Sequence, residues 1–376
     1  MGILLGSGVL QAAQPTAPSG TPTAFRVAEP HYRYQFPRDH GSHPGFKIEW
    51  WYLTGQLKHA HGDRRFGFQA TFFRRGLHPQ SQDEASSPPF LGGQQIYLAH
   101  MALLDVESGA FHYEERIHRN GWDAHADVHT LDVRNGNWSL KGRDDFARNE
   151  AMTLQGSVRA EAAFEFQLQP LKPKVIFGKE GVSRKGADPS AASHYITFTR
   201  LGATGTIQLE GETIPITGTA WMDHEISSSQ LDEHQVGWDW ASVQLNTGEE
   251  IMVYVMRRDD GGVDPFSTLA WVTRDSQLTH LQSDAFRWTP TGFWDSPHSG
   301  ARYPIESELR FQPPHSQAPL TLRFKPLVRD QEIQGELGGI RYWEGACDVL
   351  DEENRSIGTA YVELTGYDGK LAQRIR

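Results

Sequence analysis

Hydrophobic residues recur with a period of two in many short segments of this 376-residue chain. The apolar side chains of Phe66, Phe68, Ala70 and Phe72 alternate with Gly, Gln and Thr, so that one face of an extended strand is apolar. Segments with the same aromatic and β-branched character occupy residues 96–106, 164–168, 195–201, 251–256, 269–273 and 361–364. Because turn residues separate these segments and no long helix-period run interrupts them, the pattern predicts an all-β antiparallel protein built as sandwiches or closed barrels.

A faint internal repeat divides the chain. Residues 49–57, Glu-Trp-Trp-Tyr-Leu-Thr-Gly-Gln-Leu, return in altered form as residues 237–245, Gly-Trp-Asp-Trp-Ala-Ser-Val-Gln-Leu, at an offset of 188 (238 minus 50). An offset near half the chain length indicates two related domains rather than a short-period solenoid. We therefore expect a flexible leader or signal remnant over residues 1–25, an N-terminal domain over 26–225 and a C-terminal domain over 226–376.

The first residues carry a weak export signal. An apolar segment, residues 3–10, precedes Gln11-Ala12-Ala13, which is typical of the second half of a secretory signal, although the basic residues that open such a signal are missing. Residues 14–23 have the Pro, Ser, Thr and Gly content of a flexible linker. The sequence thus predicts a periplasmic or secreted protein, and a disordered leader on a cytoplasmic protein is the alternative.

Charge and cysteine content narrow the function classes. The chain has 36 Lys and Arg against 47 Asp and Glu, a net charge of −11, whereas a nucleic-acid partner requires clustered positive charge. We expect no nucleic-acid partner. The single cysteine, Cys347, permits no intramolecular disulfide, and we expect it to be a small buried hydrophobic residue.

The chain lacks the Gly-x-Ser-x-Gly, Walker, dinucleotide-binding and His-Glu-x-x-His motifs. Its ionisable residues cluster instead just after Trp221, as Asp223, His224 and Glu225. On an extended strand Trp221, Asp223 and Glu225 share one face, and Met222 and His224 share the other. If the tryptophan face meets a cavity, the two carboxyl groups enter it as well, and a desolvated carboxyl group has a raised pKa and can act as a general acid. The alternative is a hydrogen-bonded structural cluster that joins the two domains.

A second cluster places an acid beside aromatic residues at the start of the repeat. In a strand, Glu49 and Trp51 face one way, and Trp50 and Tyr52 face the other. Glu49 is then either a buried acid or an acid at the mouth of a barrel. Packing in a core is the alternative role for Trp50 and Tyr52, because two aromatic rings on one face bury a large apolar area.

A third candidate acid, Asp239, stands between Trp238 and Trp240 in the second copy of the repeat. The 17 histidines are scattered, and pairs such as His59 and His61 fall in turn-like sequence. Metal ligands need fixed geometry and an ordered outer shell. We therefore predict no metal site and no cofactor.

Several of these segments resemble one known family. They are Glu-Trp-Trp-Tyr at 49–52, Ala-Trp-Met-Asp-His-Glu at 220–225, Trp-Asp-Trp at 238–240, Tyr-Trp-Glu-Gly-Ala at 342–346 and Gly-Thr-Ala-Tyr-Val-Glu-Leu-Thr-Gly-Tyr at 358–367. Together they resemble the AttH-like, carotenoid 1,2-hydratase-like family of lipocalin-like proteins, and the Asp-His-Glu triple is similar to its predicted secreted hydrolase branch. The resemblance implies two tandem lipocalin-like antiparallel β-barrels with a cavity for an isoprenoid or fatty-acid-like ligand.

The resemblance also implies an enzyme that adds water to a double bond of an apolar substrate in a β-barrel cavity. A non-catalytic carrier of a hydrophobic ligand and an exported hydrolase are the alternatives. A hydratase needs an acid, aromatic faces that stabilise a carbocation and controlled access of water. The candidate catalytic residues are Asp223, His224, Glu225 and Asp239. The candidate ligand-binding residues are Glu49, Trp50, Trp51, Tyr52, Trp221, Trp238, Trp240 and Trp343. Peripheral contact with a membrane would suit such a ligand, and the sequence does not define the oligomeric state.

Overall fold

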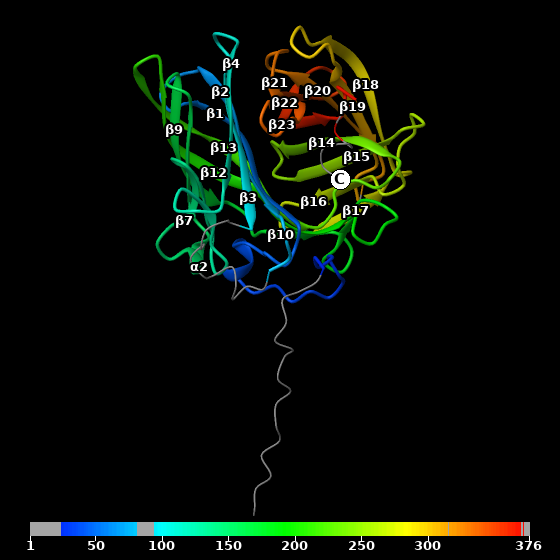
Figure 1. Cartoon of the computed structure of the whole chain (residues 1–376). Helices are drawn as coiled ribbons and strands as arrows, with labels where there is room; N and C mark the ends of the chain where they lie inside the picture. Colours follow the sequence, from blue (N-terminus) through cyan, green and yellow to red (C-terminus); the bar gives the residue numbers. More distant parts are fainter. Residues whose placement is uncertain (1–23, 81–93, 315, 370, 372–376) are drawn as a thin grey trace, which may run out of the picture.

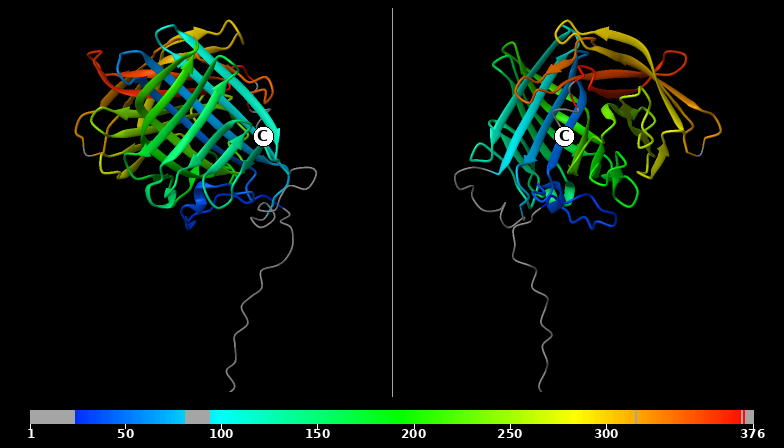
Figure 2. Two further views of the ribbon diagram at one scale, coloured as in Figure 1. Left: turned by 90° about the vertical axis from the view of Figure 1, so that its left-hand side faces the viewer. Right: turned by 45° about the vertical axis from the view of Figure 1, so that its right-hand side comes forward.

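The computed structural model describes residues 24–80, 94–314, 316–369 and 371, which fold almost entirely into strands (Figure 1). Two antiparallel sheets follow one another along the chain: one of 13 strands forms a nearly closed barrel, and one of 10 strands forms a half-barrel (Figure 2). The all-β, two-barrel architecture expected from the sequence is confirmed. The predicted leader, residues 1–25, falls almost wholly outside the described residues.

The strands have the following bounds. The N-terminal sheet contains β1 (Ile48–His59), β2 (Arg65–Gly76), β3 (Gln95–Asp105), β4 (Ala110–Arg119), β5 (Ala124–Ala126), β6 (Asp132–Asn135), β7 (Trp138–Gly142), β8 (Met152–Val158), β9 (Ala162–Pro170), β10 (Val175–Phe177), β11 (Ser183–Arg184), β12 (Ala192–Leu209) and β13 (Glu212–Ser227). The C-terminal sheet contains β14 (Gln235–Leu245), β15 (Glu250–Arg258), β16 (Thr268–Val272), β17 (Leu278–Gln282), β18 (Phe286–Asp295), β19 (Arg302–Phe311), β20 (Leu320–Pro326), β21 (Glu332–Gln334), β22 (Arg341–Leu350) and β23 (Ser356–Thr365). The described helical segments are a 3-10 turn, η1 (Arg38–His40), and a short helix, α2 (Phe146–Asn149).

The two sheets share a strand order in which the first strand lies between the second and the last. The N-terminal order is β4-β3-β2-β1-β13-β12-β9-β8-β7-β6-β5, and the C-terminal order is β17-β16-β15-β14-β23-β22-β20-β19-β18. Hence β1 and β14 occupy the same place in their sheets, as do β13 and β23, and the sequence repeat falls on β1 and β14. β13 ends at Ser227 and β14 begins at Gln235, so the chain passes from one sheet to the other just after the predicted boundary.

Alternation along each strand decides which face fills a barrel. Phe66, Phe68, Ala70 and Phe72 of β2 are all buried in the core of the N-terminal barrel, as their period of two requires. A second core fills the C-terminal half-barrel. A third core, which contains Trp221, joins the opposite faces of the two sheets. The sheets therefore pack against each other through the faces that do not point into the barrels.

A long hairpin places β13 in the middle of the N-terminal sheet. β12 and β13 pair from Leu209 and Glu212 at the turn to Ser193 and Ser227 at the far end. The two connecting residues, Glu210 and Gly211, have φ angles of 54° and 82°, the positive values that a two-residue hairpin turn requires. Because β1 pairs along the other edge of β13, the segment around Asp223 is hydrogen-bonded on both sides.

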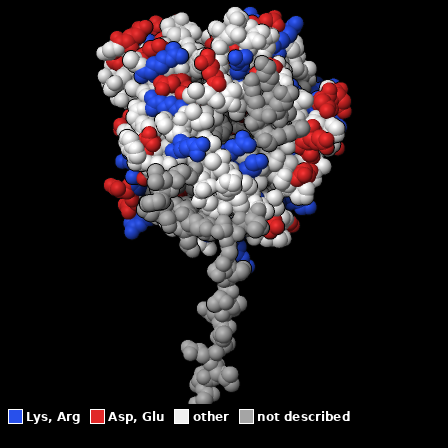
Figure 3. Space-filling view, in the orientation of Figure 1, with Lys and Arg blue, Asp and Glu red and all other residues white. Residues whose placement is uncertain are grey.

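The surface carries charges of both signs. Figure 3 shows Lys and Arg side chains interspersed with Asp and Glu side chains over the described part of this face, rather than one continuous basic area. Within the described residues, no helix has the length and apolar character needed to cross a membrane.

Candidate functional site

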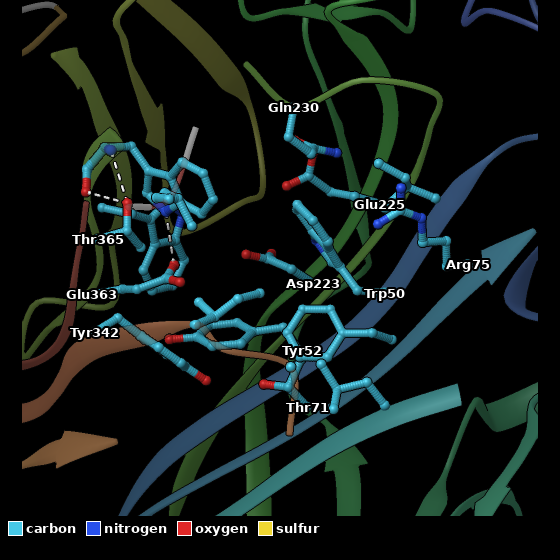
Figure 4. Close-up of a pocket in the computed structure, with 18 of the residues that line it drawn as sticks. Trp50, Tyr52, Thr71, Arg75, Asp223, Glu225, Gln230, Tyr342, Glu363 and Thr365 are labelled. Carbon is cyan, nitrogen blue, oxygen red and sulfur yellow. Dashed lines mark hydrogen bonds between the residues drawn. The ribbon is translucent and has the colours of Figure 1, made fainter. Parts of the chain in front are cut away.

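A cavity of about 340 Å³ lies between the two sheets. Its walls come mainly from β1, β2, β3 and β13 on one side and from β14, β15, β22 and β23 on the other. Figure 4 shows aromatic and carboxyl side chains pointing into it from both sides. The sequence led us to expect a ligand inside a barrel, but the barrel interiors are filled by their own cores, and the space lies where the outer faces of the two sheets meet.

Asp223 lies in β13, directly opposite Tyr52 of β1 and Thr197 of β12. Its Oδ1 accepts hydrogen bonds from the Thr197 hydroxyl at 2.6 Å and the Trp221 indole N–H at 2.7 Å, and its Oδ2 accepts one from the Tyr195 hydroxyl at 2.6 Å. Burial raises the pKa of Asp223 to about 7, although these hydrogen bonds oppose the rise. The carboxyl group can therefore carry a proton near neutral pH, and Oδ2, with one donor, is the oxygen that has room for it.

Glu225 enters the cavity from the same face of β13 but is already neutralised by a cation. Its Oε2 accepts a hydrogen bond from the Ser193 hydroxyl at 2.5 Å and forms an ion pair with the Lys185 ammonium group. Lys185 also donates to Gln230 Oε1 at 2.9 Å and lies 5.5 Å from the centre of the Trp50 ring. This arrangement holds Glu225 and Lys185 together as a fixed polar part of the wall.

The facing wall carries two more carboxyl groups, Glu363 of β23 and Glu344 of β22, which are direct cross-strand partners. Glu363 Oε2 accepts a hydrogen bond from the Trp238 indole N–H at 3.0 Å, and Glu344 Oε2 accepts one from the Tyr52 hydroxyl at 2.9 Å. Burial raises the pKa of Glu363 to about 7 and raises the pKa of Glu344 well above its ordinary value. The cavity is thus lined by carboxyl groups that can be neutral at physiological pH.

Aromatic rings form much of the rest of the wall. Trp50, Tyr52, Trp238 and Trp240 line the cavity, and the rings of Tyr52 and Trp240 meet edge to face with centroids 5.2 Å apart. Trp221 lies behind the lining, with its centroid 6.3 Å from that of Trp240, and it supports Asp223 through its N–H group. Such ring faces attract a desolvated cation.

Three of the candidates lie on the opposite faces of β1 and β13, away from the cavity. Trp51 is in the N-terminal core, and its ring stacks on that of His224 at 4.7 Å. His224 Nε2 lies 2.9 Å from Glu49 Oε1, and Arg74 Nε donates to Glu49 Oε2 at 2.8 Å. Burial opposes ionisation of Glu49, but Arg74 and the neighbouring histidines outweigh it and hold its pKa well below the ordinary value. Trp51, His224 and Glu49 therefore stabilise the barrel and do not line the cavity, whereas Arg74 belongs to both the network and the lining.

This buried group is also the place where a metal ion would find ligands. His43, Glu49 and His224 present ligand atoms within 4.8 Å of one another. Both histidine rings hydrogen-bond to Glu49 Oε1. Arg74 binds the other oxygen of the same carboxylate, and its positive charge opposes a cation there. These contacts fit a buried ion-pair network better than a metal centre.

The remaining candidates, Asp239 and Trp343, also lie outside the cavity lining. Asp239 accepts a hydrogen bond from Arg257 Nε at 3.0 Å and from the Tyr367 hydroxyl at 2.9 Å. Burial raises the pKa of Asp239 in spite of these partners. Trp343 belongs to the core of the half-barrel and donates its N–H to the Arg329 carbonyl at 2.8 Å.

The polar residues of the cavity that the sequence-based candidates did not include are headed by Lys185, Tyr195, Glu344 and Glu363. Glu344 and Glu363 lie in the segments 342–346 and 358–367, which carry the family resemblance. Their presence as acids within these motifs was the sequence feature that could have identified them as site residues. Lys185 follows the two-residue strand β11 in an irregular segment, where no periodicity predicts the direction of a side chain.

Two tandem antiparallel sheets, one a nearly closed barrel and the other a half-barrel, define a lipocalin-like class of protein. A model of the AttH-like family matches residues 27–367, and the chain belongs to that family. A search of curated proteins found no match.

Two solved structures share this fold. A protein of Nitrosomonas europaea that carries the provisional name AttH is 30% identical, with a TM-score of 0.79 over 91% of this chain and 99% of that one. Kievitone hydratase of Nectria haematococca is 13% identical, with a TM-score of 0.66 over 92% of this chain and 97% of that one. The second likeness establishes the common fold alone.

Proposed function

We propose that this protein is a hydratase-type enzyme that adds water to, or removes it from, a carbon–carbon double bond of an uncharged, isoprenoid-like substrate held between its two sheets. The observation that carries the proposal is Asp223, a carboxyl group with a pKa of about 7 that lines an aromatic cavity. A general acid works best when its pKa lies near the operating pH. The name of the structural neighbour kievitone hydratase supports hydration as a chemistry that this fold accommodates.

The reaction begins with proton transfer from Asp223 Oδ2 to one carbon of the double bond. The π electrons form the new C–H bond and leave a carbocation on the neighbouring carbon. Faces of Trp50, Tyr52 and Trp240 stabilise that charge by up to about 2 kcal/mol each when desolvated. Water then forms the C–O bond and releases one proton, so the net change is the addition of one water molecule. The hydrogen bonds from Tyr195, Thr197 and Trp221 stabilise the Asp223 carboxylate that remains.

The size and charge of the cavity define the substrate class. A volume of about 340 Å³ is at the lower end for small-molecule pockets and suits a compact terpenoid or prenylated ring, or one end of a longer chain. Two of the lining cations are paired, Lys185 with Glu225 and Arg74 with Glu49, and the third, Arg75, is exposed to solvent. The buried part of the cavity therefore suits an uncharged part of the substrate.

The hydrolase alternative has less support from the site. The lining contains no serine or cysteine among the described residues, and Cys347 is buried in the core of the half-barrel. A covalent acyl-enzyme mechanism needs such a nucleophile. A carrier requires no ionisable group in the cavity. The turnover experiment described next distinguishes a carrier from an enzyme.

The test is turnover of prenylated phenols and short terpenoids with a terminal trisubstituted double bond, in isotopically labelled water, followed by mass spectrometry. Wild-type protein should form a product that has gained one labelled water, and Asp223→Asn should lower kcat by about 10² to 10⁴-fold while still binding the substrate. Asp239→Asn is the matched control, because Asp239 is a buried acid outside the cavity. Stoichiometric binding without product by wild-type protein would indicate a carrier, and full activity of Asp223→Asn would remove this residue as the acid.

A further inference from the structure

Asp223 and Glu363 occupy equivalent positions in the two sheets. The repeat offset of 188 takes Tyr52 of β1 to Trp240 of β14 (240 minus 52). Asp223 is the cross-strand partner of Tyr52, and Glu363 is the cross-strand partner of Trp240. Because β13 and β23 have the same place in the strand order, each sheet presents one acid to the shared cavity from the same structural position.

The two acids also have one kind of hydrogen-bond donor in common. Each accepts a hydrogen bond from a tryptophan indole N–H: Trp221 for Asp223 and Trp238 for Glu363. Figure 4 shows the Asp223 carboxyl group directed toward the side of the cavity where Glu363 lies. Burial raises both pKa values to about 7, so a state with one acid protonated and the other ionised is accessible near neutral pH.

Their remaining neighbours give the two acids different roles. Asp223 accepts three hydrogen bonds, whereas Trp238 supplies the one hydrogen bond that the described residues give to Glu363. Glu363 thus has an oxygen available for water. Glu344 lies on β22, directly opposite Glu363. Its Oε2 accepts a hydrogen bond from the Tyr52 hydroxyl, and its buried Oε1 has no partner among the described residues.

Glu344 is the group beside Glu363 that can orient a water molecule. Its raised pKa keeps it protonated, and the proton belongs on Oε1, since Oε2 already accepts from Tyr52. Adjacent carboxyl groups resist simultaneous ionisation, which also favours a neutral Glu344 beside an ionised Glu363. The other charged groups that act on Glu363 are Asp223 and Glu225 of β13 and Lys185 after β11.

We propose that Glu363 is the second catalytic residue of the site, the general base that deprotonates the attacking water, with Glu344 as a positioning residue. This inference rests on the proposed hydration. Water forms the C–O bond to the carbocation and transfers one proton to Glu363, while Asp223 has given its proton to the other carbon. After one turnover Asp223 is ionised and Glu363 is protonated, and exchange of one proton with solvent at each group restores the starting state. Each domain thus supplies one half of the acid–base pair.

Steady-state kinetics of the full chain between pH 5 and 9 tests this assignment, with the prenylated substrate that the wild-type protein hydrates. Glu363→Gln should lower kcat by about 10² to 10⁴-fold with KM little changed, and Asp223→Asn should do the same. In the wild-type profile, Glu363 accounts for the fall in rate at low pH, where the base is protonated, and Asp223 accounts for the fall at high pH. Glu363→Ala should regain activity when formate is added as an external base, a response that a structural defect would not give.

Each other result has a defined meaning. Wild-type kcat and an unchanged low-pH limb in Glu363→Gln, together with an inactive Asp223→Asn, would overturn the assignment of Glu363 and leave the proposed function in place. Full activity of both variants would overturn the assignment of both acids, and absence of hydrated product from the wild-type protein would overturn the proposed function and this inference together. If Glu363→Gln does not fold, the Trp238→Phe variant replaces it as the test. This variant keeps the Glu363 carboxyl group but removes its hydrogen-bond donor, so the pKa of Glu363 rises and the low-pH limb should move to higher pH. A low-pH limb that does not move counts against Glu363.

Discussion

The hydroxyl group of Tyr52 donates a hydrogen bond of 2.9 Å to Glu344, a residue 292 positions further along the chain. Tyr52 belongs to β1 of the nearly closed barrel, and Glu344 belongs to β22 of the half-barrel. Both side chains are buried. The bond therefore joins the two sheets at the cavity and fixes which oxygen of Glu344 keeps its proton.

Removal of this bond should weaken the contact between the sheets. In Tyr52→Phe, Glu344 Oε2 loses its donor while remaining buried, which we expect to lower the free energy of unfolding by about 1 to 3 kcal/mol. Urea unfolding followed by tryptophan fluorescence measures the change. Tyr113→Phe is the control, because the Tyr113 ring is half-buried and its hydroxyl makes no hydrogen bond among the described residues. Equal stability of the two variants would show that the interdomain bond contributes little.

Stability should fall as the pH rises from about 5 to 8. The folded-state pKa values of Asp223 and Glu363 are both about 7, above the values of 3.8 and 4.5 for the free groups. In this interval the folded protein binds more protons than the unfolded chain, so raising the pH favours unfolding, by roughly 2 to 3 kcal/mol for each group. The contribution is present in full below the unfolded pKa and is lost as the pH passes the folded one.

The Asp223→Asn variant isolates one half of that effect. Its free energy of unfolding should depend less on pH between 5 and 8 than that of the wild type, because the amide does not titrate. The exposed Asp284 provides the control substitution, Asp284→Asn, which should keep the wild-type dependence. Denaturant titrations at pH 5.5 and 8 make the comparison, and the same slope in wild type and Asp223→Asn would mean that Asp223 is not protonated in the folded protein at the lower pH.

Much of the local structure follows from period-two alternation. The sequence placed Trp221, Asp223 and Glu225 on one face and His224 on the other, and the structure has this arrangement. The repeat predicted two related units, which appear as two sheets with the same strand order. Alternation alone does not say which face meets a barrel core and which meets another sheet, and for this reason Glu49 could be interpreted as a ligand-binding residue.

The composition of the cavity depends on contacts between distant parts of the chain. Glu344 became a site residue only because β22 packs opposite β1, where Tyr52 reaches it. Glu363 and Asp223 are separated by 140 positions (363 minus 223), not by the repeat offset of 188, because the two domains differ in length. Their equivalence appears only through strand order and cross-strand pairing. No local pattern contains this information.

Glu49 provides the last prediction, since its place in the barrel assigns it to stability rather than chemistry. Glu49→Gln leaves the buried Arg74 without a counter-charge, which we expect to cost about 3 to 5 kcal/mol. The matched control is Glu332→Gln: Glu332 is equally buried, but its partners are the neutral hydroxyls of Ser296, Ser299 and Tyr303, so its loss should cost less.

The pH dependence separates Glu49 from the acids of the cavity. Its pKa is depressed, so its contribution is present above the unfolded value and is lost as the pH falls through the folded one, opposite in direction to Asp223. Glu49→Gln should therefore be less sensitive to acid than the wild type, while the folded fraction keeps the wild-type pH–rate profile. Thermal unfolding between pH 3 and 7 and kinetics on the folded variant measure both. An altered pH–rate profile with unchanged stability would place Glu49 in the reaction after all, because only a group coupled to the reacting atoms can move that profile without moving the folding equilibrium.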